Sequence, residues 1–185
     1  MTEDFDHEQW AQSLQRGREE KEETFASAAQ SPLSEAARDT FEGLSWFPLD
    51  ESFVLAGRLE PTDVETVDLE ATRGPPMAYD LVGQLGIEFE GSLSVLDVYQ
   101  APGVEALLLP FRDETNGTET WTEGRYLTIK NPWAGADRQP TDVTVDFNAA
   151  YHPLCVYDST VRSALPPAEN RVDVAVRAGE RLPEE

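Results

Sequence analysis

Basic side chains are scarce in this chain, and lysine is almost absent. Only 14 of the 185 residues are Lys or Arg, against 36 Asp and Glu, so the formal net charge is −22. Lys21 and Lys130 are the only lysines. A nucleic-acid-binding protein needs a basic surface to neutralise phosphates, so this composition argues against nucleic acid as a partner.

Two interpretations of the acidity compete. One is an acidic surface for a basic partner or for many cations. The other is adaptation to a cytoplasm that holds molar salt, where the Debye length shrinks to roughly 3 Å at 1 M and repulsion between carboxylates costs little. The acidic residues occur along the whole chain rather than in one tail. This distribution favours the second interpretation, a halophilic protein.

Cysteine and long apolar runs are also lacking. Cys155 is the single cysteine, so no internal disulfide can form. No apolar stretch is long enough to span a bilayer, and the acidic N-terminus does not resemble a secretory signal. We therefore expect a cytoplasmic protein without a membrane partner.

The N-terminal segment has a helical pattern. One narrow stripe at helical spacing consists of Trp10, Leu14, Lys21 and Phe25. The run 18–23 is interpreted as a solvated face, and Ser34 as the N-cap of a short helix that ends near Phe41. We expect a helical arm over residues 1–30 that lies on a single β-rich domain over residues 31–185.

From Trp46 onward, the hydrophobic period changes to two, as expected for strands. The nine candidate strands cover residues 53–59, 64–69, 79–82, 85–90, 93–99, 104–111, 125–129, 143–147 and 172–176. Their close spacing leaves no room for the crossover helices of a parallel sheet. The sequence thus predicts a mainly β (α+β) fold, an antiparallel barrel or sandwich of roughly nine short strands with one or two N-terminal helices.

Polar residues follow the buried strand 104–111 directly. Asp113 lies in a stretch that continues to the turn signal Asn116-Gly117. The stretch is either a polar hairpin end or the mouth of a barrel, where ligands tend to bind.

Arg125 begins an otherwise apolar strand and is followed by Tyr126. A buried guanidinium needs a partner. Two roles are open: an ion pair with Asp113 or Asp146, or an anchor for a carboxylate or phosphate group of a ligand.

Several reactive residue types gather between residues 146 and 157. The candidates are Asp146, Asn148, Tyr151, His152 and Cys155. The imidazole and the thiol could act as a base and a nucleophile, but a lone cysteine among apolar residues is usually a small buried hydrophobe. Because no spaced Cys/His set occurs, the sequence predicts no metal site.

Five motifs occur in a fixed order along the second part of the chain. They are Trp46-Phe47-Pro48-Leu49-Asp50, Gly117 to Leu127 ending in Gly-Arg-Tyr-Leu, Asp146-Phe147-Asn148 through Tyr157, Pro166-Pro167 with Glu169-Asn170, and Ala178-Gly179-Glu180. In combination, they resemble the domain of unknown function 1684 family over about residues 40–181. The resemblance implies one shared architecture and carries no catalytic signature. In that family, Asn often stands at the position of His152, and a second cysteine at the position of Ala164, which argues against a catalytic His152 and a metal site at Cys155.

Two hypotheses about function follow. In the first, a small-molecule-binding protein or enzyme holds an anionic ligand in a pocket at one end of a β-barrel. The ligand-binding residues would be Arg125 as the anchor, with Asp113, Asn116, Tyr126, Asp146, Asn148, Tyr151 and Cys155 around it. The alternative is a non-catalytic interaction module that docks through the N-terminal helix. The chain has no phosphate-binding loop, dinucleotide fingerprint or serine-nucleophile elbow, so no cofactor or reaction is predicted.

Overall fold

The computed structural model describes residues 5–183. Two α-helices, α1 (His7–Ser27) and α2 (Glu35–Arg38), come first. The strands are β1 (Ser45–Trp46), β2 (Val54–Leu69), β3 (Met77–Phe89), β4 (Ser92–Gln100), β5 (Leu107–Phe111), β6 (Arg125–Ile129), β7 (Thr141–Asp146) and β8 (Glu180–Arg181). Short 3-10 turns lie at Glu51–Phe53, Phe147–Ala149 and Leu154–Val156.

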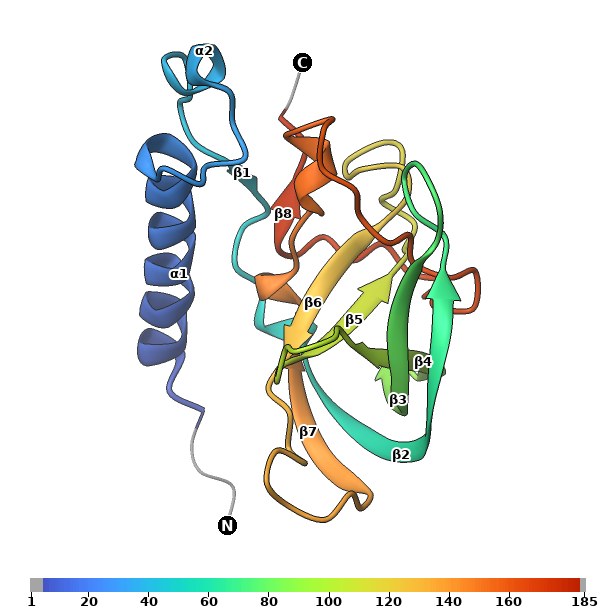
Figure 1. The fold of residues 1–185 in the computed structure, drawn as a ribbon. Coiled ribbons are helices and arrows are strands. Elements are labelled where there is room, and N and C mark those ends of the chain that lie inside the picture. Colours follow the sequence, from blue (N-terminus) through green and yellow to red (C-terminus); the bar gives the residue numbers. More distant parts are fainter. Residues whose placement is uncertain (1–4, 184–185) are drawn as a thin grey trace.

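Six of the strands form one antiparallel sheet in the order β6-β5-β4-β3-β2-β7. The sheet curls into a half-barrel, and β1 and β8 pair as a separate two-stranded sheet beside it (Figure 1). The main apolar core fills the concave side and includes Leu59, Leu85, Leu96, Leu109 and Phe147. The predicted mainly β, antiparallel fold with N-terminal helices is confirmed.

Two pairs of expected strands are continuous. Residues 53–59 and 64–69 belong to the single strand β2, whose register to β3 shifts between Pro61 and Glu65. Proline has no N–H for the ladder and is tolerated at such a bulge, so the interruption in the sequence bends the strand without ending it. Likewise, 79–82 and 85–90 lie in β3, with a register shift between Leu81 and Gly83.

The prediction of a strand over residues 172–176 is wrong, because the structure has no strand there. Val172 and Val176 are buried, but their segment is irregular. Its backbone is held by single bonds, from Val172 N to Arg112 O (2.9 Å) and from Glu114 N to Val174 O (3.1 Å). The burial of Val172 and Val176 thus comes from contact with the loop after β5. The strand that forms near the C-terminus is the two-residue β8, which pairs with β1.

Helix α1 runs along the outside of the β body (Figure 1). Its N-cap is Asp6, whose carboxylate accepts from Gln9 N, and its buried residue is Phe25, which packs edge-on against Tyr157. Ser34 caps α2 as expected, although this helix ends at Arg38 rather than near Phe41. No helix in the described part of the chain has both the length and the hydropathy needed to cross a bilayer.

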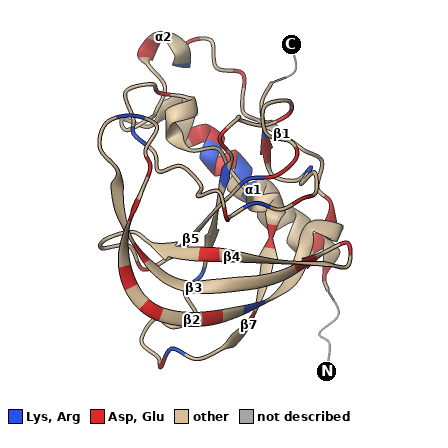
Figure 2. Cartoon of the chain, turned by 90° about the vertical axis from the view of Figure 1, so that its right-hand side faces the viewer, with Lys and Arg blue, Asp and Glu red and all other residues tan. Residues whose placement is uncertain are grey.

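Acidic residues are distributed over the helices, the strands and the loops, and several follow one another along β2 (Figure 2). Basic residues are fewer, and some of them lie on α1. Arg18 and Lys21 of α1 contact the β body, although the helix as a whole carries more Glu than Lys and Arg.

Candidate functional site

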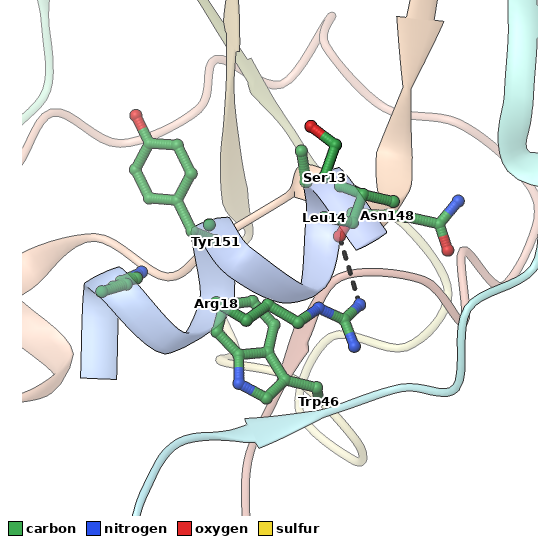
Figure 3. A pocket seen from close by; sticks show the side chains of 9 residues that line it. Ser13, Leu14, Arg18, Trp46, Asn148 and Tyr151 are labelled. Carbon is green, nitrogen blue, oxygen red and sulfur yellow. Dashed lines mark hydrogen bonds between the residues drawn. The ribbon is translucent and has the colours of Figure 1, made fainter. Parts of the chain in front are cut away.

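A cavity of about 230 Å³ lies where α1 crosses the β body (Figure 3). We call it the seam cavity. It is lined by Ser13, Leu14, Gly17, Arg18 and Lys21 of α1, by Trp46 of β1, and by Asn148, Ala149 and Tyr151 after β7. Most of this lining is apolar. A concave, mainly apolar site with a few polar groups is the usual form of a small-molecule site.

Arg18 is the main charged group of the seam cavity. Its Nη1 donates to Phe47 O (3.2 Å) and its Nη2 to Asn148 O (3.3 Å). The guanidinium carbon lies 4.7 Å from the centre of the Trp46 ring, which gives a cation–π contact. Its Nε is buried without a hydrogen-bond partner, and Arg18 makes no ion pair within 4.0 Å among residues 5–183.

The electrostatics of Arg18 favour a further anion. Burial lowers the pKa of its guanidinium, and the carboxylates of Asp146 and Glu22 act in the opposite direction from a distance. A guanidinium has five N–H donors, and only two take part in the bonds to Phe47 and Asn148. Arg18 thus has donors to spare and incomplete charge compensation.

Lys21 lies one turn further along the same face of α1. Its Nζ is 3.0 Å from Glu180 Oε2 and about 5 Å above the ring of Tyr151. Glu180 is fully buried, and the same Oε2 accepts from His152 N (2.6 Å) while Oε1 accepts from the Tyr157 hydroxyl. Lys21 therefore neutralises a buried carboxylate and already has its counter-ion.

Trp46 is held in place by the strand pairing of β1 and β8 and by a hydrogen bond. It lies opposite Glu180 in the ladder, and its Nε1 donates to Glu22 Oε1 (2.8 Å). The same Glu22 oxygen accepts from Leu44 N (3.2 Å). The indole is consequently fixed as a flat wall beneath Arg18 (Figure 3).

Asp146 and Asn148 form the floor of this region. Asp146 Oδ2 accepts from Trp10 Nε1 of α1 (2.7 Å), and its Oδ1 accepts from both Asn148 N and Nδ2 (2.9 Å each). The Asn148 amide also bonds both backbone groups of Asp50, at 2.9 and 2.7 Å. With all these bonds made, the two side chains fasten α1 and the 46–50 segment to the end of β7.

Arg125 forms an ion pair with Asp113, which is one of the two roles that the sequence left open. It is fully buried, and its Nη2 is 3.1 Å from Asp113 Oδ2 and donates to Val176 O (2.7 Å). Its Nη1 donates to the carbonyls of Ala178 (2.5 Å) and Glu180 (3.0 Å). A guanidinium enclosed in this way clamps the C-terminal segment and presents no face to a ligand in this structure.

The other predicted site residues lie apart from the seam cavity. Asn116 organises its own loop, since its Oδ1 accepts from Asp113 N (2.8 Å) and its Nδ2 donates to Thr120 (2.9 Å). Tyr126 is buried, and its hydroxyl donates to Ala164 O. Cys155 is a half-buried free thiol. Across residues 5–183, no group of three or more His, Cys, Asp or Glu side chains is arranged to hold a metal ion.

His152 is a buried, neutral imidazole. Its Nε2 accepts from Trp121 N (3.1 Å), so the ring proton belongs on Nδ1, which lies 3.4 Å from the Tyr157 hydroxyl. Burial, with smaller contributions from Arg125 and Lys21, lowers its pKa to about 3. It thus acts as a hydrogen-bond acceptor for the backbone and has no free nitrogen for a base role.

Of the predicted site residues, the structure brings Asn148 and Tyr151 to the seam cavity, with Asp146 beside them, and it pairs Asp113 with Arg125 elsewhere. Sequence reasoning missed Arg18 and Trp46. A signal was present, because Arg18 stands four residues after Leu14 and so shares the stripe on which Lys21 was placed.

Comparison with known proteins places the chain in a family. The family model described as Protein of unknown function (DUF1684) matches residues 39–181. The solution NMR structure of an uncharacterised protein from Haloarcula marismortui is 35% identical, and the similarity covers 97% of each chain with a TM-score of 0.74. That coverage includes most of α1, which precedes the family match. No curated protein matches the chain. The chain belongs to the DUF1684 family of proteins of unknown function.

Proposed function

We propose that the seam cavity binds a small organic anion, with Arg18 as its anchor. The observation that carries the proposal is the state of Arg18 itself. It is half-buried over Trp46 at the wall of a cavity, its Nη1 and Nη2 each make one bond to a backbone carbonyl and keep a second N–H, and no carboxylate among residues 5–183 lies within ion-pair distance. Such a guanidinium fits the planar, two-oxygen edge of a carboxylate.

The rest of the cavity supports an organic rather than an inorganic anion. Leu14, Trp46 and Tyr151 contribute apolar and aromatic surface beside the charge. The volume of about 230 Å³ lies below the ~300–1,000 Å³ of drug-sized pockets, so the group bound there is small. Lys21 adds positive potential at one wall, although its direct partner is Glu180.

This proposal keeps the anionic ligand of the sequence-based hypothesis and changes its position. Asn148 and Tyr151 remain lining residues, whereas the anchor moves from Arg125 to Arg18. The pocket lies between α1 and the body rather than at one end of the curled sheet.

The alternative, an interaction module that docks through α1, has less support. Trp10 bonds Asp146, Leu14 lines the seam cavity, and Phe25 is buried against Tyr157. The stripe intended for a partner therefore packs on the protein's own body, and docking would require α1 to detach.

We also propose that the protein works in a cytoplasm with molar salt. The support is the net charge of −22 with only two lysines, and the occurrence of acidic residues along the whole chain. At 1 M salt the Debye length is ~3 Å, which is close to the distance between the charged atoms of an ion pair. Repulsion between more distant carboxylates is therefore screened, whereas direct ion pairs are weakened less.

The test is a binding titration in molar KCl with benzoate, butanoate and inorganic phosphate as probes. We expect benzoate and butanoate to quench or shift tryptophan fluorescence through Trp46, with phosphate weaker. Arg18→Gln should weaken carboxylate binding at least ten-fold. The matched control is Arg16→Gln, which removes the same charge from the exposed face of α1. The proposal is overturned if none of the probes binds, or if Arg18→Gln binds them as well as Arg16→Gln does.

A further inference from the structure

A second cavity adjoins the first. It also has a volume of about 230 Å³ and lies over β5 and β6. We call it the tyrosine groove. Its lining includes Tyr79, Val104, Leu108, Tyr126 and Tyr151, and none of its lining side chains is charged. The chain has 36 acidic residues, so a cavity lined by apolar and phenolic side chains stands out. An apolar group of a ligand would lose contact with water by binding there, which is favourable.

Tyr151 lines both cavities, so its side chain is a wall that they share. On one side, Lys21 Nζ lies 5.0 Å from the ring centre. The hydroxyl points away from Arg18 and Trp46 (Figure 3) and pairs with Thr128 Oγ1 at 2.9 Å. Cationic groups and an uncharged groove thus flank one half-buried aromatic side chain.

We propose that the ligand is an amphipathic carboxylate of the medium-chain fatty acid type. Its carboxylate binds Arg18 in the seam cavity, and its apolar chain passes over Tyr151 into the tyrosine groove beside Val104 and Leu108. This inference rests on the proposed function, because it needs the anion anchor at Arg18. It adds the class of the ligand and the path of its apolar part.

Three features favour this class over a compact anion. The seam cavity alone is small, whereas the two cavities together fall within the range of small-molecule sites. The charge lies at one end only, since the tyrosine groove has no cation for a second acidic group. Val104 at the rim of the groove is 49% exposed, an apolar side chain left open to water beside it.

The test is a chain-length series with the full protein in molar KCl. The probes are butanoate, hexanoate, octanoate and decanoate, below their micelle concentrations, with decan-1-ol as the uncharged counterpart. Each methylene group buried in the tyrosine groove should tighten binding by about three- to four-fold. We expect decanoate to bind at least ten-fold more tightly than hexanoate, and decan-1-ol to bind more weakly than decanoate.

The variant Val104→Asp places a carboxylate in the lining of the tyrosine groove, at a residue that is 49% exposed. It should remove the gain for decanoate and leave butanoate binding unchanged. Val64→Asp is the matched control, because Val64 is also exposed (56%) and lines neither cavity. Ala106→Phe, which fills the groove without adding charge, should have the same effect as Val104→Asp.

Each contrary result has a distinct meaning. If butanoate binds through Arg18 and affinity does not rise with chain length, the seam cavity binds anions and the present inference is wrong. If decanoate and decan-1-ol bind equally and Arg18→Gln changes neither, the groove takes apolar molecules without a head-group anchor, and the inference again fails. If no carboxylate of any length binds, the proposed function fails with it.

Discussion

The guanidinium of Arg125 and the carboxylate of Asp113 form an ion pair at 3.1 Å, and neither side chain is exposed to solvent. The carboxylate also accepts from Val176 N (2.9 Å) and from the Thr115 hydroxyl (2.7 Å). Burial lowers the pKa of Arg125, and Asp113 is the largest opposing contribution. Removing one partner of such a pair leaves an uncompensated buried charge.

Arg125→Met is therefore expected to destabilise the fold by about 3–5 kcal/mol, and Asp113→Leu by a similar amount. The loss should persist in molar KCl, because salt hardly screens a buried pair. The measurement is chemical denaturation at two salt concentrations. Arg177→Met is the control, since its pair with Glu119 is on the surface, and it should change the midpoint little. An Arg125→Met protein as stable as the wild type would show that this buried pair does not hold the C-terminal segment in place.

Gly179 and Gly91 give a second test of what holds the C-terminal segment. Both have a positive φ, +77° and +84°. A Cβ on Gly179 would lie 2.5 Å from Ala150 O, whereas one on Gly91 meets nothing within 4 Å. Gly91→Ala should cost roughly 1–2 kcal/mol, the left-handed backbone penalty alone. Gly179→Ala should cost clearly more, because the Arg125 clamp on the 176–180 carbonyls must also shift. Equal denaturation midpoints for the two variants would show that segment 176–180 can shift to accommodate the methyl group at no further cost in stability.

Local pattern was enough to predict much of the fold. The hairpin of β3 and β4, the strand β6 and the Ser34 cap each depend on residues close in sequence, and each was predicted within a few positions. Periodicity and turn chemistry carry this kind of information.

Partners distant in sequence were not predictable in the same way. The carbonyls that hold Arg125 lie 51 to 55 residues away, and those that hold Arg18 are 29 and 130 residues away. A hydrophobic stripe shows that a helix face is covered but not what covers it. Arg18 was assigned to a solvated run because its neighbours are acidic, yet its position on the stripe places it in the seam cavity.

His152 couples the same region to pH. The imidazole is fully buried, and burial is the main reason that its pKa falls from 6.5 to about 3. The folded protein consequently binds fewer protons at His152 than the unfolded chain does. The stability linked to this group is fully present above pH 6.5 and is lost as the pH falls toward 3, at up to about 1.4 kcal/mol per pH unit.

His152→Gln isolates that contribution. The Gln side-chain oxygen can accept from Trp121 N in place of Nε2, but it does not titrate. Between pH 7 and pH 5, the wild type should lose about 2 kcal/mol more stability than the variant. The carboxylates are the same in both proteins, so the difference between the two stability curves reports the residue at position 152. The measurement is chemical denaturation at half-unit pH steps in molar KCl. Parallel stability curves for the two proteins would mean that the folded state accommodates a charged imidazole, through movement of Lys21 and Arg125 away from the ring.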